Sequence, residues 1–305
     1  MATVPESVAV FDRALVRRHR ERAAPSGAAH DFLFREAAER LADRLDDTSR
    51  RFPLALDLGS RAGAFDAVRG GRGGIETLVQ CDLAFAAAER LRPPRLVLDE
   101  EALPFAEGSL DLVVSVLALH WVNDLPGALV QLRRALKPDG LFLGAMLGGR
   151  TLGELRQCLA DAEIAETGGL SPRVSPFADG RDCGGLLQRA GFALPVVDSD
   201  LLTVTYPDAL ALMRDLRGMG EANAVIERLR RPTRRAVLLR AAALYAERFA
   251  GDDGRIAASF EILTMTAWAP SPAQQQPLRP GSAATRLADA LGAVERPAGE
   301  RAPRG

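Results

Sequence analysis

The feature that most limits the fold of this chain is the alternation of short apolar runs with helical periodicity between residues 54 and 147. Runs with the character of buried strands lie at 54–58, 76–81, 95–98, 110–117 and 141–147. The segments between them repeat apolar residues at the spacing of a helix. Strands and helices that alternate at this pitch form a parallel sheet with helices on both faces. The region therefore predicts an α/β fold.

The part of the chain after residue 149 has a different rhythm, in which longer helical segments separate the remaining strands. Helices are expected at 151–166, 182–190, 208–217 and 234–250, and strands at 196–206 and 259–268. Thr151 and Glu154 have the spacing of a capping box at the start of the first of these helices. Together the segments predict a Rossmann-like sheet of seven mostly parallel strands, of which the last is antiparallel.

These segments divide the chain into three parts. Residues 1–50 are expected to form an N-terminal helical arm, and residues 51–268 the α/β domain. Helical insertions at 151–181 and 207–256 lie on the carboxyl side of the sheet and, with the arm, are expected to form a lid. Residues 269–305 are rich in proline, glutamine, alanine and arginine, a composition typical of a disordered tail.

The composition limits the kinds of partner that the chain can have. Hydrophobic residues make up 47% of it and charged residues 26%, with a formal net charge of -1. A protein that binds a polyanion usually carries a basic excess, so we expect no nucleic-acid partner. No segment approaches the roughly 18 apolar residues of a transmembrane helix. The first 30 residues also lack the apolar segment of a secretory signal.

Cysteines and histidines give little support for a metal site. The three cysteines are far apart and form no CxxC pair, which is typical of reduced thiols in a cytosolic protein. A non-haem iron oxygenase normally needs two histidines and one carboxylate. The chain has only His19, His30 and His120, and the first two lie in the N-terminal arm. We therefore predict no metal site.

The stretch LDLGSRAGAF, residues 56–65, lies between the first predicted strand and a helix start. Gly59 and Gly63 let the backbone turn tightly and approach a ligand. A dinucleotide loop would have further glycines where Arg61 and Ala64 stand, so that reading is weak. The carboxylate of Asp57 would repel a pyrophosphate, but it suits a ligand with an ammonium or sulfonium group.

Two more acids follow the next two predicted strands. Asp82 ends the second strand, where a carboxylate can accept two hydrogen bonds from a ribose diol. Asp99 follows the third strand, where it can accept a hydrogen bond from an adenine amino group. Taken singly, each is as readily a surface acid in a turn. Three acids at the carboxyl ends of successive parallel strands predict one ligand crevice.

The motifs LDLGSRAG, QCDL, LDEEALPF, LDLVVSVLALHW and ALKPDGLFL resemble those of class I S-adenosylmethionine-dependent methyltransferases of type 11. The resemblance implies that the glycine loop holds the methionine part of the cofactor, the second acid its ribose and the third its adenine. By position, the implied cofactor-binding residues are Asp57, Gly59, Gly63, Asp82, Asp99 and Glu100.

Arg61 departs from that family pattern, in which a glycine is expected. A guanidinium close to a sulfonium is unfavourable. We therefore expect the side chain of Arg61 to point away from the ligand or to pair with a nearby carboxylate. Its backbone is expected to adopt a conformation that a side chain tolerates.

A closer resemblance is carried by VFDRAL near the start and by LSPRVSPFADGRDCGGLLQRAGF and MRDLRGMGEAN later in the chain. These segments look like the complex I assembly factors of mitochondria and alphaproteobacteria, from about Val8 to about Leu287. The resemblance implies hydroxylation of an arginine on an iron–sulfur subunit of NADH–quinone oxidoreductase. It is consistent with a bacterial cytoplasmic protein that meets the membrane through its partner.

Three alternatives stay open at this point. Direct methyl transfer needs only positioning, a dry pocket and sometimes a base, and the residues support it more easily than hydroxylation. The malonyl-carrier-protein methyltransferases of biotin synthesis are similar over the first half of the chain. A non-catalytic assembly chaperone is the third alternative. The sequence gives no indication of the oligomeric state.

Four residues are candidates for the reacting end of the site. His120 follows the fourth strand and can act as a base near neutral pH, or it can pack beside Trp121 under the next helix. Tyr206 ends the sixth strand and can wall a substrate pocket or belong to the core. Glu221 and Asn223 lie in a glycine-containing turn, where either can hold a guanidinium or an amide.

The arginine-rich run ERLRRPTRR, residues 227–235, is a further feature of the late part of the chain. Such a run can attract an acidic partner, although it is more often a solvated loop and helix start.

Overall fold

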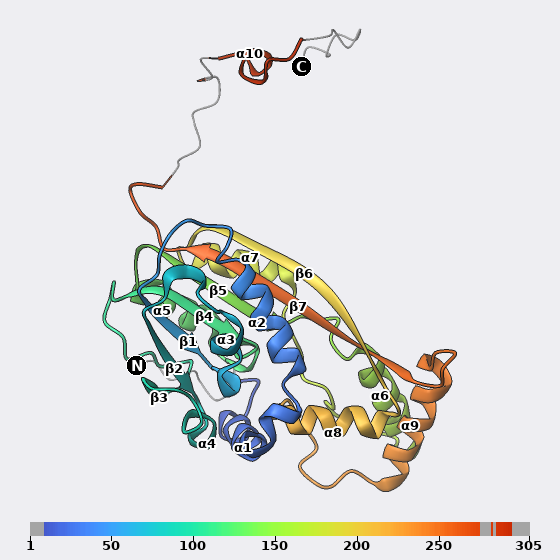
Figure 1. Cartoon of the computed structure of the whole chain (residues 1–305). Coiled ribbons are helices and arrows are strands. Elements are labelled where there is room, and N and C mark those ends of the chain that lie inside the picture. The colour runs from blue at the N-terminus through green and yellow to red at the C-terminus, as the bar shows by residue number, and fades with distance from the viewer. Residues whose placement is uncertain (1–8, 275–281, 283–284, 295–305) are drawn as a thin grey trace. The chain divides into compact units, whose positions relative to one another are not determined.

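A seven-stranded sheet forms the centre of the computed structural model, which describes residues 9–274, 282 and 285–294 (Figure 1). The strands are β1 (Leu54–Leu58), β2 (Thr77–Asp82), β3 (Arg95–Val97), β4 (Leu110–Val116), β5 (Leu136–Leu147), β6 (Ala193–Tyr206) and β7 (Ile256–Trp268). Their order is β3-β2-β1-β4-β5-β7-β6. The first five strands are parallel, and β7 pairs antiparallel with both β5 and β6. The predicted Rossmann-like sheet of seven mostly parallel strands is confirmed.

Helices cover both faces of this sheet. They are α1 (Arg13–Ala23), α2 (Phe32–Asp43), α3 (Ala64–Val68), α4 (Phe85–Ala88), α5 (Leu125–Ala135), α6 (Gly153–Thr167), α7 (Gly180–Arg189), α8 (Ala209–Met219) and α9 (Arg235–Phe249). One core cluster contains side chains of α2, α3, α6, α8 and α9, and a second contains side chains of α5 and α7. Successive side chains of β4 belong to these two clusters in turn, because neighbouring residues of a strand point to opposite faces.

The predicted insertions contain α6, α8 and α9, which gather at the carboxyl side of the parallel strands (Figure 1). The helix α1 packs against α4 and α8. The second helix of the predicted arm, α2, buries Leu33, Ala37 and Leu41 in the first core cluster. This part of the arm is therefore a layer of the domain. No helix among the described residues is both long and apolar enough to cross a membrane.

Two local predictions differ from the structure. The strand predicted at 141–147 is longer in the structure, where β5 already begins at Leu136. Thr151 and Glu154 do not form a capping box, because Leu152 is the N-cap and makes no side-chain hydrogen bond. The hydroxyl of Thr151 accepts from the backbone of Glu261, and Glu154 accepts from Ser259. Both side chains therefore tie the start of α6 to β7.

A second unit of the chain begins at Ser271. Its described part contains the short helix α10 (Leu287–Leu291). Most of the predicted disordered tail, 269–305, lies outside the described residues.

Candidate functional site

The glycine loop after β1 turns through backbone conformations that favour glycine. Gly59 has a φ of +71°, and a Cβ at this position would lie 2.3 Å from the Cβ of Ala118. Gly63 has a φ of +80°. Arg61 and Ala62 also have positive φ, at 45° and 61°, although they carry side chains. A left-handed conformation costs a residue with a Cβ about 1–2 kcal/mol, so Arg61 does not adopt the tolerant backbone that we expected.

The side chain of Arg61 reaches a carboxylate, which is one of the two outcomes expected from the sequence. Its Nη2 donates to Oε1 of Glu221 at 2.5 Å and to the backbone oxygen of Leu117 at 3.0 Å. The guanidinium carbon lies 5.0 Å from the ring centroid of Phe34. The side chain is 4% exposed. These contacts hold the guanidinium in the interior and offset the cost of its backbone conformation.

Glu221 is the acceptor for three buried donors. Besides Arg61, Nε2 of His120 lies 3.0 Å from its Oε2, and Nε1 of Trp121 donates to the same oxygen at 2.8 Å. The side chain of Glu221 is 3% exposed. Burial alone would raise the pKa of this carboxyl, but the charge of Arg61 and the contact with His120 outweigh burial and lower the pKa to about 2. Glu221 is therefore ionised in the folded protein at neutral pH.

For His120, unlike Glu221, burial has a larger effect on the pKa than the neighbouring charge. Burial lowers its pKa, and the neighbouring Glu221 does not compensate fully. A neutral ring that donates from Nε2 to Glu221 carries no proton on Nδ1. That Nδ1 is buried and has no hydrogen-bond partner among the described residues. His120 therefore presents an unprotonated nitrogen, as a general base requires.

The acids of the predicted crevice at the ends of β2 and β3 are paired with arginines of α1. Nη1 of Arg20 lies 2.6 Å from Glu100 and 3.6 Å from Asp82. Arg13 donates to Asp99 at 2.6 Å and also to Glu100. The side chains of Arg20, Asp82 and Glu100 are at most 2% exposed. Burial would raise the pKa of Glu100, but Arg20 and Arg13 outweigh it and lower the pKa to about 2.

Sequence reasoning missed Arg13 and Arg20. They are seven residues apart, which is two helical turns, so they lie on the same face of α1. Residues 13–23 contain several arginines. The seven-residue spacing of Arg13 and Arg20 was the one pattern in the sequence that could have indicated that these two point the same way. Their acidic partners, however, are more than 60 residues away in the sequence.

The chemistry of the crevice suits S-adenosylmethionine. Oδ2 of Asp82 and Oδ1 of Asp57 are buried and have no partner among the described residues. Two free carboxylate oxygens beside a glycine loop suit a ribose diol and a cationic group.

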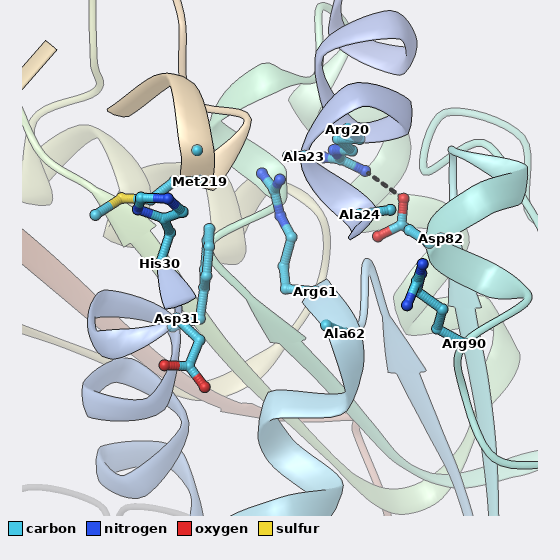
Figure 2. A pocket seen from close by; sticks show the side chains of 13 residues that line it. Arg20, Ala23, Ala24, His30, Asp31, Arg61, Ala62, Asp82, Arg90 and Met219 are labelled. Carbon is cyan, nitrogen blue, oxygen red and sulfur yellow. Dashed lines mark ion pairs between the residues drawn. The ribbon is translucent and has the colours of Figure 1, made fainter. Parts of the chain in front are cut away.

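The space in the crevice is too small in this conformation. The cavity beside Asp82 and Arg61 has a volume of about 40 Å³, whereas ligand pockets usually have roughly 300–1,000 Å³. Figure 2 shows the arginines that surround it, with the ion pair between Arg20 and Asp82 drawn as a dashed line. In this conformation the cavity therefore has no room for a ligand of the size of S-adenosylmethionine.

Asp57 is fully buried at the end of β1. Its Oδ2 has one weak donor, Nε2 of Gln80 at 3.4 Å. Burial outweighs the hydrogen bonds from Gln80 and Ser60 and raises the pKa of Asp57 from 3.8 to about 7. The stability that this group contributes is fully present below its unfolded pKa, and it is lost as the pH rises through about 7.

This shift predicts a pH-dependent effect of Asp57→Asn. Between pH 5 and pH 8 the wild-type protein is expected to lose about 2–3 kcal/mol of unfolding free energy through Asp57. The amide of the variant cannot ionise, so the variant gains that amount relative to wild type over the same interval. Urea unfolding of both proteins at the two pH values measures the difference. Parallel pH profiles would show that burial of Asp57 does not perturb its ionisation.

A larger cavity, which we call the lid cavity, lies on the other side of Glu221 and has a volume of about 490 Å³. Its apolar wall comes from α6 and α8, and its polar lining includes Glu221 and Asn223. Asn223 donates to the backbone oxygen of Pro172 at 2.8 Å and accepts from the backbone of Val225 at 3.0 Å. Asn223 therefore ties the loop that follows α8 to the loop between α6 and α7.

The structure places Glu221 and Asn223 in the lining of the lid cavity and His120 against Glu221, but it does not bring Tyr206 there. The hydroxyl of Tyr206 donates to Asp215 at 2.8 Å, and Asp215 also contacts Nδ1 of His30 at 2.5 Å. The ring belongs to the first core cluster. In the described part of the chain, no group of three or more His, Cys, Asp or Glu side chains is placed to hold a metal ion.

Comparisons with known proteins agree with the architecture of this site. Residues 56–144, which contain the glycine loop and the acids, match the family model of a methyltransferase domain. The human mitochondrial arginine-hydroxylase NDUFAF5 is 45% identical over 289 residues, covering 92% of this chain and 83% of the human protein. The protein of the same name from Danio rerio is 42% identical over 287 residues, covering 92% of this chain and 89% of its own.

Similarity at a lower level extends to other proteins. The malonyl-[acyl-carrier protein] O-methyltransferase of Xylella fastidiosa is 36% identical over 271 residues, covering 86% of this chain and 90% of its own. Among solved structures, the YcgJ protein from Bacillus has a TM-score of 0.51 at 15% identity, covering 76% of this chain and 98% of its own. This last likeness concerns the fold alone.

Proposed function

The chain belongs to the family of the arginine-hydroxylase NDUFAF5 proteins, and on that premise we propose that it binds S-adenosylmethionine in the crevice and modifies an arginine of a protein partner. The partner that we propose is an iron–sulfur subunit of NADH–quinone oxidoreductase, modified while that complex is assembled. The protein would act in the bacterial cytoplasm and meet the membrane through this partner.

The observation that carries the proposal is the buried Glu221. It already holds one guanidinium, that of Arg61, and it lines the lid cavity. A carboxylate has about four acceptor sites, and the donors from Arg61, His120 and Trp121 use three of them. Among the described residues Oε1 accepts only from Arg61, so it can accept a second N–H from a guanidinium that enters through the lid cavity.

Two reactions are compatible with this site. Hydroxylation is supported by the relatives of 42–45% identity that are named arginine hydroxylases. Methyl transfer is the second candidate, supported by the methyltransferase-domain match and by the malonyl-[acyl-carrier protein] relatives at 34–36%. When bound, S-adenosylmethionine supplies a methyl group on a sulfonium. In either case Glu221 would orient the guanidinium. In methyl transfer, Nδ1 of His120 would accept the proton that the methylated guanidinium nitrogen loses. Hydroxylation would in addition consume dioxygen and two electrons from a reductant.

Mass spectrometry of the partner subunit, purified from cells with and without this gene, tests the proposal. Hydroxylation is expected to add the mass of one oxygen to one arginine, only when the gene is present. A gain of one methylene at that arginine would establish methyl transfer. An unchanged mass, together with a defect in assembly of the complex, would reject both reactions and leave a chaperone role.

Binding of the cofactor makes a separate prediction for Asp82. Its free Oδ2 is the expected acceptor for the ribose diol, so Asp82→Ala should weaken S-adenosylmethionine by about 1–3 kcal/mol. Calorimetric titration measures the change. Asp111→Ala is the matched control, because Asp111 lies at the start of β4 and pairs with Lys137. Equal affinity of the Asp82 variant and wild type would remove Asp82 from the site.

A further inference from the structure

The rim of the lid cavity carries two arginines that have no anionic partner. Arg22 at the end of α1 and Arg217 at the end of α8 are both exposed and line the cavity. Neither side chain has an ion pair or hydrogen bond to a described residue. The pKa of Arg22 is lowered, first by burial and then by the charge of Arg217. Two adjacent guanidinium groups repel each other unless an anion lies between them.

The other two arginines of the cavity differ because the protein itself supplies their counter-charges. Arg173 pairs with Glu163, and Arg228 pairs with Asp12. The first pair fixes the loop between α6 and α7 to α6, and the second fixes the loop after α8 to the residue before α1. The unpaired charge of the cavity therefore lies with Arg22 and Arg217.

The run at residues 227–235 extends this charge beyond the cavity. Arg228, Leu229 and Thr233 of the run line the cavity wall. Its remaining arginines are exposed and have no partner among the described residues: Arg230, Arg231, Arg234 and Arg235. The whole chain has a net charge of -1, so this concentration of unpaired positive charge is a local feature. Such a surface attracts an acidic ligand.

The inside of the cavity is apolar on one side and acidic at one point. The apolar wall consists of the N-cap residue Leu152 and of Leu155 and Leu159 in α6. Phe177 adds an aromatic ring to this wall. The single carboxylate of the lining is that of Glu221. An apolar wall suits the side chains of a polypeptide, and an interior carboxylate disfavours a nucleic acid or another polyanion at that point.

We propose that the lid cavity receives an acidic polypeptide segment, whose carboxylates pair with Arg22 and Arg217 while a guanidinium within the segment reaches Glu221. This inference names the substrate class of the site proposed above and rests on that proposal. Carboxylates bind guanidinium groups in a geometry that allows two hydrogen bonds, which fixes orientation as well as affinity. The arginine to be modified would thus be recognised by acidic residues near it in sequence.

Fluorescence anisotropy with a synthetic peptide tests the inference. The probe is a labelled peptide in which leucine and glutamate residues flank one arginine, and its counterpart has glutamine in place of each glutamate. We expect the acidic probe to bind at least tenfold more tightly than the glutamine counterpart. The double variant Arg22→Gln, Arg217→Gln should lose at least tenfold in affinity for the acidic probe and change little toward the counterpart.

The matched control is the double variant Arg181→Gln, Arg189→Gln, which removes two exposed arginines of α7. It should bind the acidic probe as wild type does. Equal binding of both peptides by wild type, or unchanged binding by the Arg22 and Arg217 variant, would overturn the inference. Competition by a single-stranded oligonucleotide at the same site, with higher affinity than the peptide, would also overturn it.

The result is separable from that of the proposed function. A modified arginine on the partner together with no preference for the acidic probe would leave the proposed function intact and reject this inference. If binding of the probe depends on Arg22 and Arg217 but the partner is not modified, the inference would stand and the proposed function would be rejected. In a modification assay, the Arg22 and Arg217 variant should raise KM for the partner and leave kcat unchanged, as expected for lost substrate binding.

Discussion

Replacement of Arg20 by methionine is expected to tighten the binding of S-adenosylmethionine by tenfold or more. Arg20 pairs with the carboxylates of Asp82 and Glu100, which we propose as ligands of the cofactor. On this proposal, wild type binds the cofactor only in the state in which Arg20 has left the crevice, and the apparent affinity is reduced in proportion to the fraction of molecules in that state. Methionine has a similar length but makes no ion pair, so no ion pair has to break when the ligand displaces its side chain.

The same substitution should destabilise the ligand-free protein. Removal of one partner from a buried ion pair typically costs about 3–5 kcal/mol, because the other charge stays buried. Glu100 keeps Arg13, so the loss should lie toward the lower end of that range. The variant is thus expected to unfold at a lower temperature without the cofactor and to regain more stability than wild type when the cofactor is added.

Calorimetric titration and thermal unfolding, each with and without S-adenosylmethionine, measure both effects. Arg17→Met is the matched control, since Arg17 lies on the same helix and is exposed. It should change neither quantity. A weaker affinity of the Arg20 variant would show that Arg20 contacts the cofactor directly, and would reject the competition described here.

The fold was predictable because its signal is local. The central strands of the parallel part are buried on both faces, so each appears in the sequence as an apolar run, as Leu110–Val116 does. The ends of such runs also locate the acids, because the residue that follows a parallel strand lies at the ligand edge of the sheet. Asp82 and Asp99 were placed in one crevice from this rule, and the structure brings them together through Arg13, Arg20 and Glu100.

The arrangement inside the site was not predictable, because it depends on contacts between distant segments. Arg61 and Glu221 are 160 residues apart, and no local pattern relates them. The sequence indicated that Arg61 points away from the ligand or pairs with a carboxylate, and that Glu221 can hold a guanidinium. Nothing in the sequence indicated that each is the other's partner. Tyr206 illustrates the same limit, since the direction of its side chain depends on the pairing of β6 with β7.

The pair of Arg61 and Glu221 is expected to give the largest effect on stability. Arg61→Met leaves Glu221 ionised and buried, and Glu221→Met leaves Arg61 charged and buried. Each single variant should lose about 3–5 kcal/mol of unfolding free energy. For a domain of this size, each kcal/mol lowers Tm by about 2–4 °C. The double variant removes both charges, so its loss should be smaller than the sum of the two by about 2–3 kcal/mol.

A double-mutant cycle from urea unfolding at neutral pH measures this coupling. The donors of His120 and Trp121 lose their acceptor in both proteins that carry Glu221→Met, so their contribution cancels in the cycle. The folded pKa of Glu221 is lowered to about 2 from 4.5, so the stability that its charge contributes is present above about 4.5 and is lost as the pH falls through about 2. Arg69→Met with Asp66→Met, a more exposed pair on α3, should show a coupling of about 1 kcal/mol or less.

The size of the coupling also decides what Arg61 does in the glycine loop. A strong coupling means that Arg61 is held by Glu221 and that its left-handed backbone is sustained by this pair. Arg61→Gly would then relieve the backbone strain but lose the pair, so it should be destabilising overall. Additive single variants would mean that the two charges are stabilised independently. In that case Glu221 would not depend on Arg61 to stay ionised. The pair of Arg61 and Glu221 would then no longer support the proposal that Glu221 binds a substrate guanidinium.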